Sequence, residues 1–142
     1  MNTNEYQIGK THMGCFDTGE DLLEGIERFA ADRNIRVARI TVIGAVRTAV
    51  VAYYDQTVRE YQEVTFGEPM EILGCLGNLS LKEGKPIAHL HAVFGDSQGQ
   101  TRGGHVRPGT DVFFAEVIIE ELEGPELHRG YDPVTGLPAW EL

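Results

Sequence analysis

Glycine distribution constrains the fold of this chain more than any other feature of its sequence. Seventeen glycines are spread along 142 residues, where they separate short apolar runs from one another. Glycine at such breaks marks turns, and short apolar runs between turns are typical of strands. We therefore expect a β-rich domain with many turns.

One segment follows a helical pattern instead. Its apolar residues recur at helical spacing and form one stripe, made by Leu22, Leu23, Ile26, Phe29 and Ala30. Asp17 and Thr18 can cap its start. Glu20 and Asp21 place negative charge in the first turn, where the helix dipole favours it. Asn34 suits the C-terminal end of this helix. The sequence therefore predicts one helix, whose apolar stripe must pack against another part of the protein.

The predicted strands are rich in β-branched and apolar residues. They lie at 35–46, 48–54, 61–66, 70–81, 87–94 and 111–122. The first two join at residues 44–47, and the segment 96–104 is typical of a polar, glycine-rich loop. Many strands and one good helix imply a helix packed on a curved, mostly antiparallel sheet. The predicted fold class is therefore α+β.

Chain length sets the expected domain organisation. A chain of 142 residues has the usual size of one domain, and no linker or repeat interrupts it, so we expect a single domain over residues 1–142. No apolar run approaches the roughly 20 residues of a membrane span, and no signal-peptide pattern begins the chain. We expect a cytoplasmic protein without membrane contact, in which Cys15 and Cys75 are reduced.

Three histidines form the most chemically informative pattern. His89 and His91 are two residues apart on a predicted strand, so their side chains project from the same face. His105 follows after a loop that is long enough to fold back toward them. Gly103 and Gly104, just before it, allow close backbone approach. The three imidazoles are therefore predicted to converge.

Three neutral nitrogen ligands suit zinc first, and nickel, cobalt or iron after it. A site with three protein ligands keeps a fourth position for water or a small ligand. The alternative is structural, because half-buried histidines that hydrogen-bond to the backbone are common. The spacing alone leaves both interpretations open.

Glu116 is the candidate for acid–base chemistry or for supporting a metal ligand. It lies on the predicted strand 111–122 among apolar side chains, where an unpaired buried charge would be costly. An exposed position or a salt bridge between subunits accounts for it equally well. Arg102 and Arg107 flank His105 and could attract a small anionic ligand, or they could be ordinary solvated arginines of a loop.

The net charge of −10 argues against nucleic acid as a partner. Such a charge repels the phosphate backbone, whereas DNA-binding proteins usually present a basic surface. The notable basic residues are Arg33, Arg36 and Arg39, with Arg28 one turn earlier. We expect this group to balance acidic surface on a neighbouring subunit.

Most of the chain resembles a known family. The core resembles the PPC (plants and prokaryotes conserved) domain through the run EILGCLGNLSLKEGKPIAHLHAVFGDSQGQTRGGHVRPGTDVFFAEVIIEEL. The family pattern there is P-x-x-H-x-H, then G-G-H, then a strand carrying A-E-V. The family's helix and following strands are similar to GEDLLEGIERFAADRNIRVARITVIGAVRTAVVAYYD, and a tail of its bacterial members is similar to YDPVTGLPAW.

The resemblance implies an α+β domain that assembles as a homotrimer. It also implies a metal, commonly zinc, at His89, His91 and His105. Plant relatives carry an AT-hook, a short Arg-Gly-Arg-Pro element that enters the DNA minor groove, and this sequence contains no such element. We therefore discount the DNA-binding label that is often attached to the family.

Together these features predict a trimeric metal-binding protein of unassigned activity. It would hold a small ligand or perform metal-assisted chemistry. The alternative is a non-catalytic oligomeric module for interaction or regulation, because no nucleophile–base pair accompanies the histidines. Whether the protein is an enzyme stays open at this point.

Overall fold

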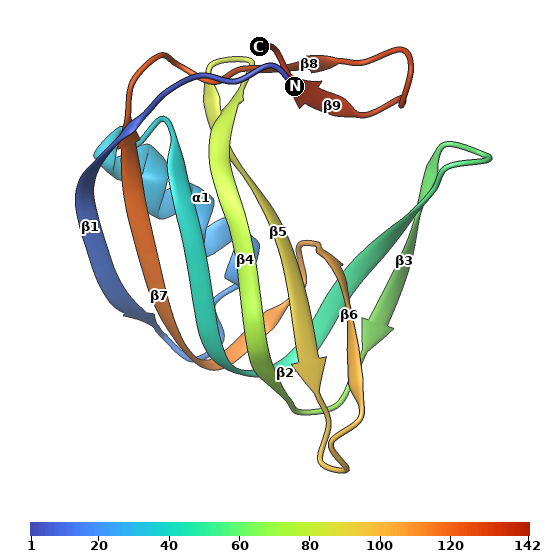
Figure 1. Cartoon of the computed structure of the whole chain (residues 1–142). Coiled ribbons are helices and arrows are strands. Elements are labelled where there is room, and N and C mark those ends of the chain that lie inside the picture. The colour runs from blue at the N-terminus through green and yellow to red at the C-terminus, as the bar shows by residue number, and fades with distance from the viewer.

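A computed structural model describes all 142 residues (Figure 1). Its elements along the chain are β1 (Gln7–Phe16), α1 (Leu22–Arg33), β2 (Ala38–Asp55), β3 (Glu60–Phe66), β4 (Met70–Lys82), β5 (Lys85–Gly95), β6 (Thr101–Val106), β7 (Asp111–Glu123), β8 (Arg129–Tyr131) and β9 (Pro138–Trp140). The single helix, at 12 residues, is too short to span a bilayer.

The seven longer strands form one antiparallel sheet in the order β1-β7-β2-β4-β5-β6, with β3 paired to β2. The short strands β8 and β9 form a separate C-terminal hairpin. One helix lies against the large sheet (Figure 1). The predicted α+β class, a helix on a curved antiparallel sheet, is confirmed.

Strand β2 runs unbroken through the segment where the sequence predicted a turn. Its first part pairs with β4 and β7, and its second part pairs with β3 and β6. The predicted break is a bulge at Gly44, whose φ of 143° is a conformation that other residues rarely adopt. The prediction of two strands was wrong because this bulge bends the strand without ending it.

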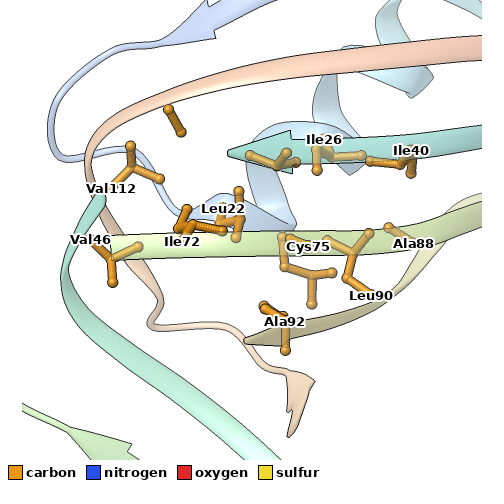
Figure 2. Close-up of a cluster of buried hydrophobic side chains, with 14 of the residues drawn as sticks. Leu22, Ile26, Ile40, Val46, Ile72, Cys75, Ala88, Leu90, Ala92 and Val112 are labelled. Carbon is orange, nitrogen blue, oxygen red and sulfur yellow. The ribbon is translucent and has the colours of Figure 1, made fainter. Parts of the chain in front are cut away.

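The core lies between α1 and one face of the sheet. Leu22 and Ile26 of the helix pack with Ile40, Cys75 and Leu90 of three neighbouring strands (Figure 2). Each large apolar side chain buried in this way contributes about 1.5–3 kcal/mol. The apolar stripe of the helix thus packs on the sheet, as expected. We call the face of the sheet that points away from the helix the outer face.

The helix begins one turn later than its predicted cap. Asp21 is the N-cap, and its carboxylate accepts hydrogen bonds from the N–H groups of Leu23 and Glu24. Thr18 donates instead to the carbonyl of Phe113, so it fastens the preceding turn to β7. The C-cap Asn34 adopts the left-handed conformation, as its position suggested.

The predicted loop at 96–104 contains the start of β6. The prediction of a loop was wrong here because Gly103 and Gly104 lie in β6 and pair with β5. The strand β1 and the C-terminal hairpin were not predicted at all. Strands β1 and β6 lie at the two ends of the sheet order, and the hairpin forms a sheet of its own, so none of them carries the strong apolar pattern of a central strand.

Candidate metal centre

Strand pairing brings the three histidines together. His91 of β5 lies directly opposite His105 of β6, and His89 lies two residues away along β5. Leu90, between the two β5 histidines, is fully buried on the helix side. The imidazoles therefore project from the outer face. We call these three residues the histidine cluster.

The geometry of the histidine cluster suits a metal. One ring nitrogen from each residue lies within 4.8 Å of the others, and the Nε2 atoms of His89 and His91 are 3.2 Å apart. Two nitrogens bound tetrahedrally to one zinc ion at about 2.05 Å would lie roughly 3.3 Å apart. The cluster therefore fits a transition metal with only small adjustments of the rings.

The electrostatic environment keeps two of these imidazoles in the form that binds metal. Burial, with the positive charges of Arg129 and His91, lowers the pKa of His89 from 6.5 to about 4. Burial also lowers the pKa of His105 to about 4, with help from the neighbouring histidines and arginines. At neutral pH both rings are uncharged and carry a free lone pair.

Two glycines permit the strand spacing that the cluster needs. A Cβ on Gly103 would lie 2.2 Å from the carbonyl oxygen of Ala92, and one on Gly104 would lie 3.0 Å from that of Ala52. The first distance is impossible without moving the backbone of β5. The expectation that these glycines allow close approach next to His105 is confirmed.

Aromatic and basic side chains surround the cluster. The ring of Tyr61 lies 5.3 Å from that of His105, and the guanidinium carbon of Arg107 lies 5.8 Å from the centre of the Tyr61 ring. Arg107 pairs with Glu63 and Arg102 with Glu68, both at 3.3 Å. The two arginines that the sequence suggested for an anion therefore already have acidic partners.

Sequence reasoning missed two residues near the cluster, Tyr61 and Arg129. Tyr61 lies on β3 and Arg129 on the C-terminal hairpin, far from the histidines along the chain. Neither residue belongs to a spaced motif, so the sequence carries no signal for them. Only the folding of both segments toward the outer face brings them near.

Glu116 lies elsewhere on the outer face. It is exposed on β7, opposite Ile43 of β2 and Cys15 of β1. Strands β2 and β4 separate β7 from β5, which places the carboxylate roughly 14 Å from the histidine strand. Within one chain Glu116 does not join the histidine cluster, and its acid–base role stays a prediction that requires a second subunit.

One row of paired residues crosses the whole outer face. It runs through Met13, Ile118, Thr41, Leu76, His91 and His105. Two members, Met13 and Leu76, are 78% and 65% exposed, and neighbouring Ile43 is 51% exposed. The outer face thus joins the histidine cluster to a band of uncovered apolar side chains.

Comparison with curated proteins finds a matching segment within a larger protein. The chain is 32% identical over 120 residues to the bifunctional protein GlmU of Synechococcus sp. (strain JA-3-3Ab), a match that covers 83% of this chain. The match covers only 18% of that protein, so this chain spans about a fifth of its relative's length.

Two solved structures match over the full chain. A metal-containing protein of Archaeoglobus fulgidus is 40% identical, with a TM-score of 0.95 and complete coverage of both chains. A plant- and prokaryote-conserved (PPC) protein of Pyrococcus horikoshii is 32% identical, with a TM-score of 0.94 over 100% of this chain and 98% of that one.

The family model agrees with these structures. The model of the Plants and Prokaryotes Conserved (PCC) domain matches residues 3–123, which contain all three clustered histidines and end before the C-terminal hairpin. The resemblance noted in the sequence is thereby confirmed. The chain belongs to the plants and prokaryotes conserved domain family.

Proposed function

We propose that this protein is a homotrimer that binds a transition metal, zinc first, and holds a small ligand or performs metal-assisted chemistry beside it. A metal with three protein ligands supplies a Lewis-acidic position for an oxygen atom of a small molecule. His89, His91 and His105 would hold the metal. Glu116 would act as an acid–base or supporting group from another subunit.

The convergent histidine cluster is the observation that carries this proposal. Its nitrogens lie within 4.8 Å of one another, and burial keeps two of its rings neutral. No carboxylate belongs to the cluster, and a set of three imidazoles favours zinc over magnesium or calcium. The matching Archaeoglobus fulgidus protein, 40% identical, is itself described as containing metal.

The band of exposed apolar side chains supports an oligomer. A monomer seldom leaves such a contiguous band in water, whereas subunit interfaces use it. Leu76 and Ile43 lie at its centre, on the two middle strands of the sheet. The number of subunits, three, comes from the family resemblance.

Metal content per chain is the measurement that tests the metal site. Protein purified without an affinity tag or added metal is expected to contain about one transition-metal ion per chain by mass spectrometry. His89→Ala is expected to lose it. His128→Ala is the matched control, because that histidine pairs with Glu126 at 3.1 Å and lies outside the histidine cluster.

A metal-free but folded wild-type protein would contradict this proposal. It would favour the alternative of a non-catalytic oligomeric module for interaction or regulation, in which the histidines hydrogen-bond to one another. The 3.2 Å contact between His89 and His91 is short enough for such a bond. Equal metal content in His89→Ala and the wild type would exclude the histidine cluster as the site.

A further inference from the structure

The C-terminal hairpin places a half-buried guanidinium on the outer face of the sheet. Arg129, the first residue of β8, donates from Nε to the hydroxyl of Ser80 at 2.7 Å and from Nη2 to the side-chain oxygen of Asn78 at 2.8 Å. It also donates from Nη1 to the carbonyl of Pro138 at 3.0 Å. These bonds fix the position of the guanidinium above β4.

This position is next to the histidine cluster. Asn78, which holds Nη2 of Arg129, is paired directly with His89 across β4 and β5. Side chains of directly paired residues start about 5 Å apart on the same face. In agreement, the positive charge of Arg129 adds to burial in lowering the pKa of both His89 and His105.

Arg129 has no carboxylate within 4.0 Å, a property that it shares only with Arg33 and Arg59 among the nine arginines, and of these three it alone borders the histidine cluster. Six arginines form ion pairs with carboxylates, namely Arg28, Arg36, Arg39, Arg47, Arg102 and Arg107. The three partners of Arg129 are all neutral. A guanidinium has five N–H donors, so two of them remain for a ligand. A half-buried cation without a counter-charge favours an anion at this place.

Tyr61 of β3 also lies next to the histidine cluster. Its ring lies 5.3 Å from that of His105, and its phenol is close enough to Arg129 for an electrostatic interaction. No hydrogen bond within the chain engages its hydroxyl. Of the two arginines that help to lower the pKa of His105, Arg107 is paired with Glu63 at 3.3 Å and Arg129 has no carboxylate partner.

We propose that Arg129 and Tyr61 form a subsite for the carboxylate of a small organic acid beside the histidine cluster. A planar carboxylate matches the remaining guanidinium donors and can accept from the phenol. A single unpaired arginine suits one negative charge, and a phosphate dianion would call for more cations. This assignment rests on the proposed function, because it supplies the ligand that the metal position would share.

Binding of glycolate tests the subsite. The zinc-loaded wild-type protein is titrated with glycolate and with its neutral isostere glycolamide, by calorimetry and by the fluorescence of Trp140. This only tryptophan lies 5.5 Å from the guanidinium carbon of Arg129. We expect saturable binding of glycolate and a loss of affinity of roughly tenfold or more in Arg129→Gln.

Arg59→Gln is the matched control. Arg59 also lacks an ion pair with a carboxylate within 4.0 Å, and it donates to the carbonyl of Pro133 in the C-terminal hairpin. It does not contribute to the pKa shifts of the clustered histidines. This variant is expected to bind glycolate as the wild type does. Equal affinity in Arg129→Gln and Arg59→Gln would overturn the subsite, as would tighter binding of inorganic phosphate than of glycolate.

Two further measurements separate the subsite from the metal and from folding. If metal-free wild-type protein still prefers glycolate over glycolamide and Arg129→Gln does not, the subsite stands even where the metal site fails. Arg129 also fastens the hairpin, so Arg129→Gln could weaken binding by loosening it. Two other variants address this: Arg129→Lys keeps the positive charge, and Tyr61→Phe leaves the hairpin contacts of Arg129 in place. Both are expected to weaken glycolate binding, and unchanged affinity in both would overturn the subsite.

Discussion

Two residues of the histidine cluster, His89 and His105, are expected to make the folding stability depend on pH. In the metal-free protein the pKa of His89 and of His105 is about 4, against 6.5 for an ordinary histidine. Between these values the unfolded chain binds more protons than the folded one, so folding stability falls as the pH falls from about 6.5 to about 4. The melting temperature of metal-free protein across this range is the measurement.

The variant His105→Gln separates this effect from the titration of carboxylates. It removes one of the two depressed histidines, so its melting temperature should fall less steeply with falling pH than that of the wild type. Identical slopes would mean that His105 is protonated normally in the folded protein.

Glu116→Gln probes the role assigned to the carboxylate. The side chain is exposed on β7, so we expect an unchanged melting temperature and unchanged metal content. The pH dependence of ligand binding at the metal should change, because the carboxylate is proposed to act from a second subunit. If the variant instead dissociates to monomers in ultracentrifugation, Glu116 forms part of the subunit interface and has no chemical role.

At the scale of elements, the pairing of β5 with β6 decides whether the histidine cluster forms. Gly103→Ala would push a Cβ to 2.2 Å from the carbonyl of Ala92 and separate these strands. We expect the variant to lose several kcal/mol of stability and to bind metal far more weakly. Chemical denaturation and metal competition assays measure the two effects.

Gly67→Ala is the control for this change. A Cβ at Gly67 would contact nothing within 4 Å, so this variant should keep both its stability and its metal affinity. Wild-type metal affinity in Gly103→Ala would show that the cluster forms without close pairing of the two strands.

Most elements that the sequence predicted well have a strong periodic pattern; the exception is β3, which is exposed except at its last residue. The helix and the strands β4, β5 and β7 bury one regular face each, so their apolar spacing was visible. Strand β6 was hidden because Gly103 and Gly104 resemble loop residues. The convergence of the histidines followed from the two-residue period of a strand, whereas the approach of Arg129 depended on an unpredicted hairpin.

For the whole molecule, the apolar band on the outer face predicts self-association. Ile43→Lys places a charge at the centre of this band, where Ile43 is 51% exposed in the single chain. The wild type should sediment at three times the chain mass. Ile43→Lys should sediment at lower mass, because burying the lysine charge in a subunit interface costs free energy. Val134→Lys, in the C-terminal hairpin segment, changes a 77% exposed residue and should remain trimeric.

The charge of the whole molecule predicts that it does not bind DNA. With a net charge of −10 it lacks the field that attracts phosphate backbones. Titration of duplex DNA at physiological salt, followed by fluorescence anisotropy, should give no appreciable binding. Sub-micromolar affinity would contradict the reasoning from charge and would require a basic surface formed by the assembled subunits.

The C-terminal hairpin has a consequence for how such proteins diversify. The three histidines lie within residues 3–123, which the family shares, whereas Arg129 lies beyond that boundary. In the proposals above, residues 3–123 would hold the metal, whereas the carboxylate subsite would take Tyr61 from this part and Arg129 from the tail. Exchanging tails among relatives would then replace one half of the proposed subsite while the three clustered histidines stay in place.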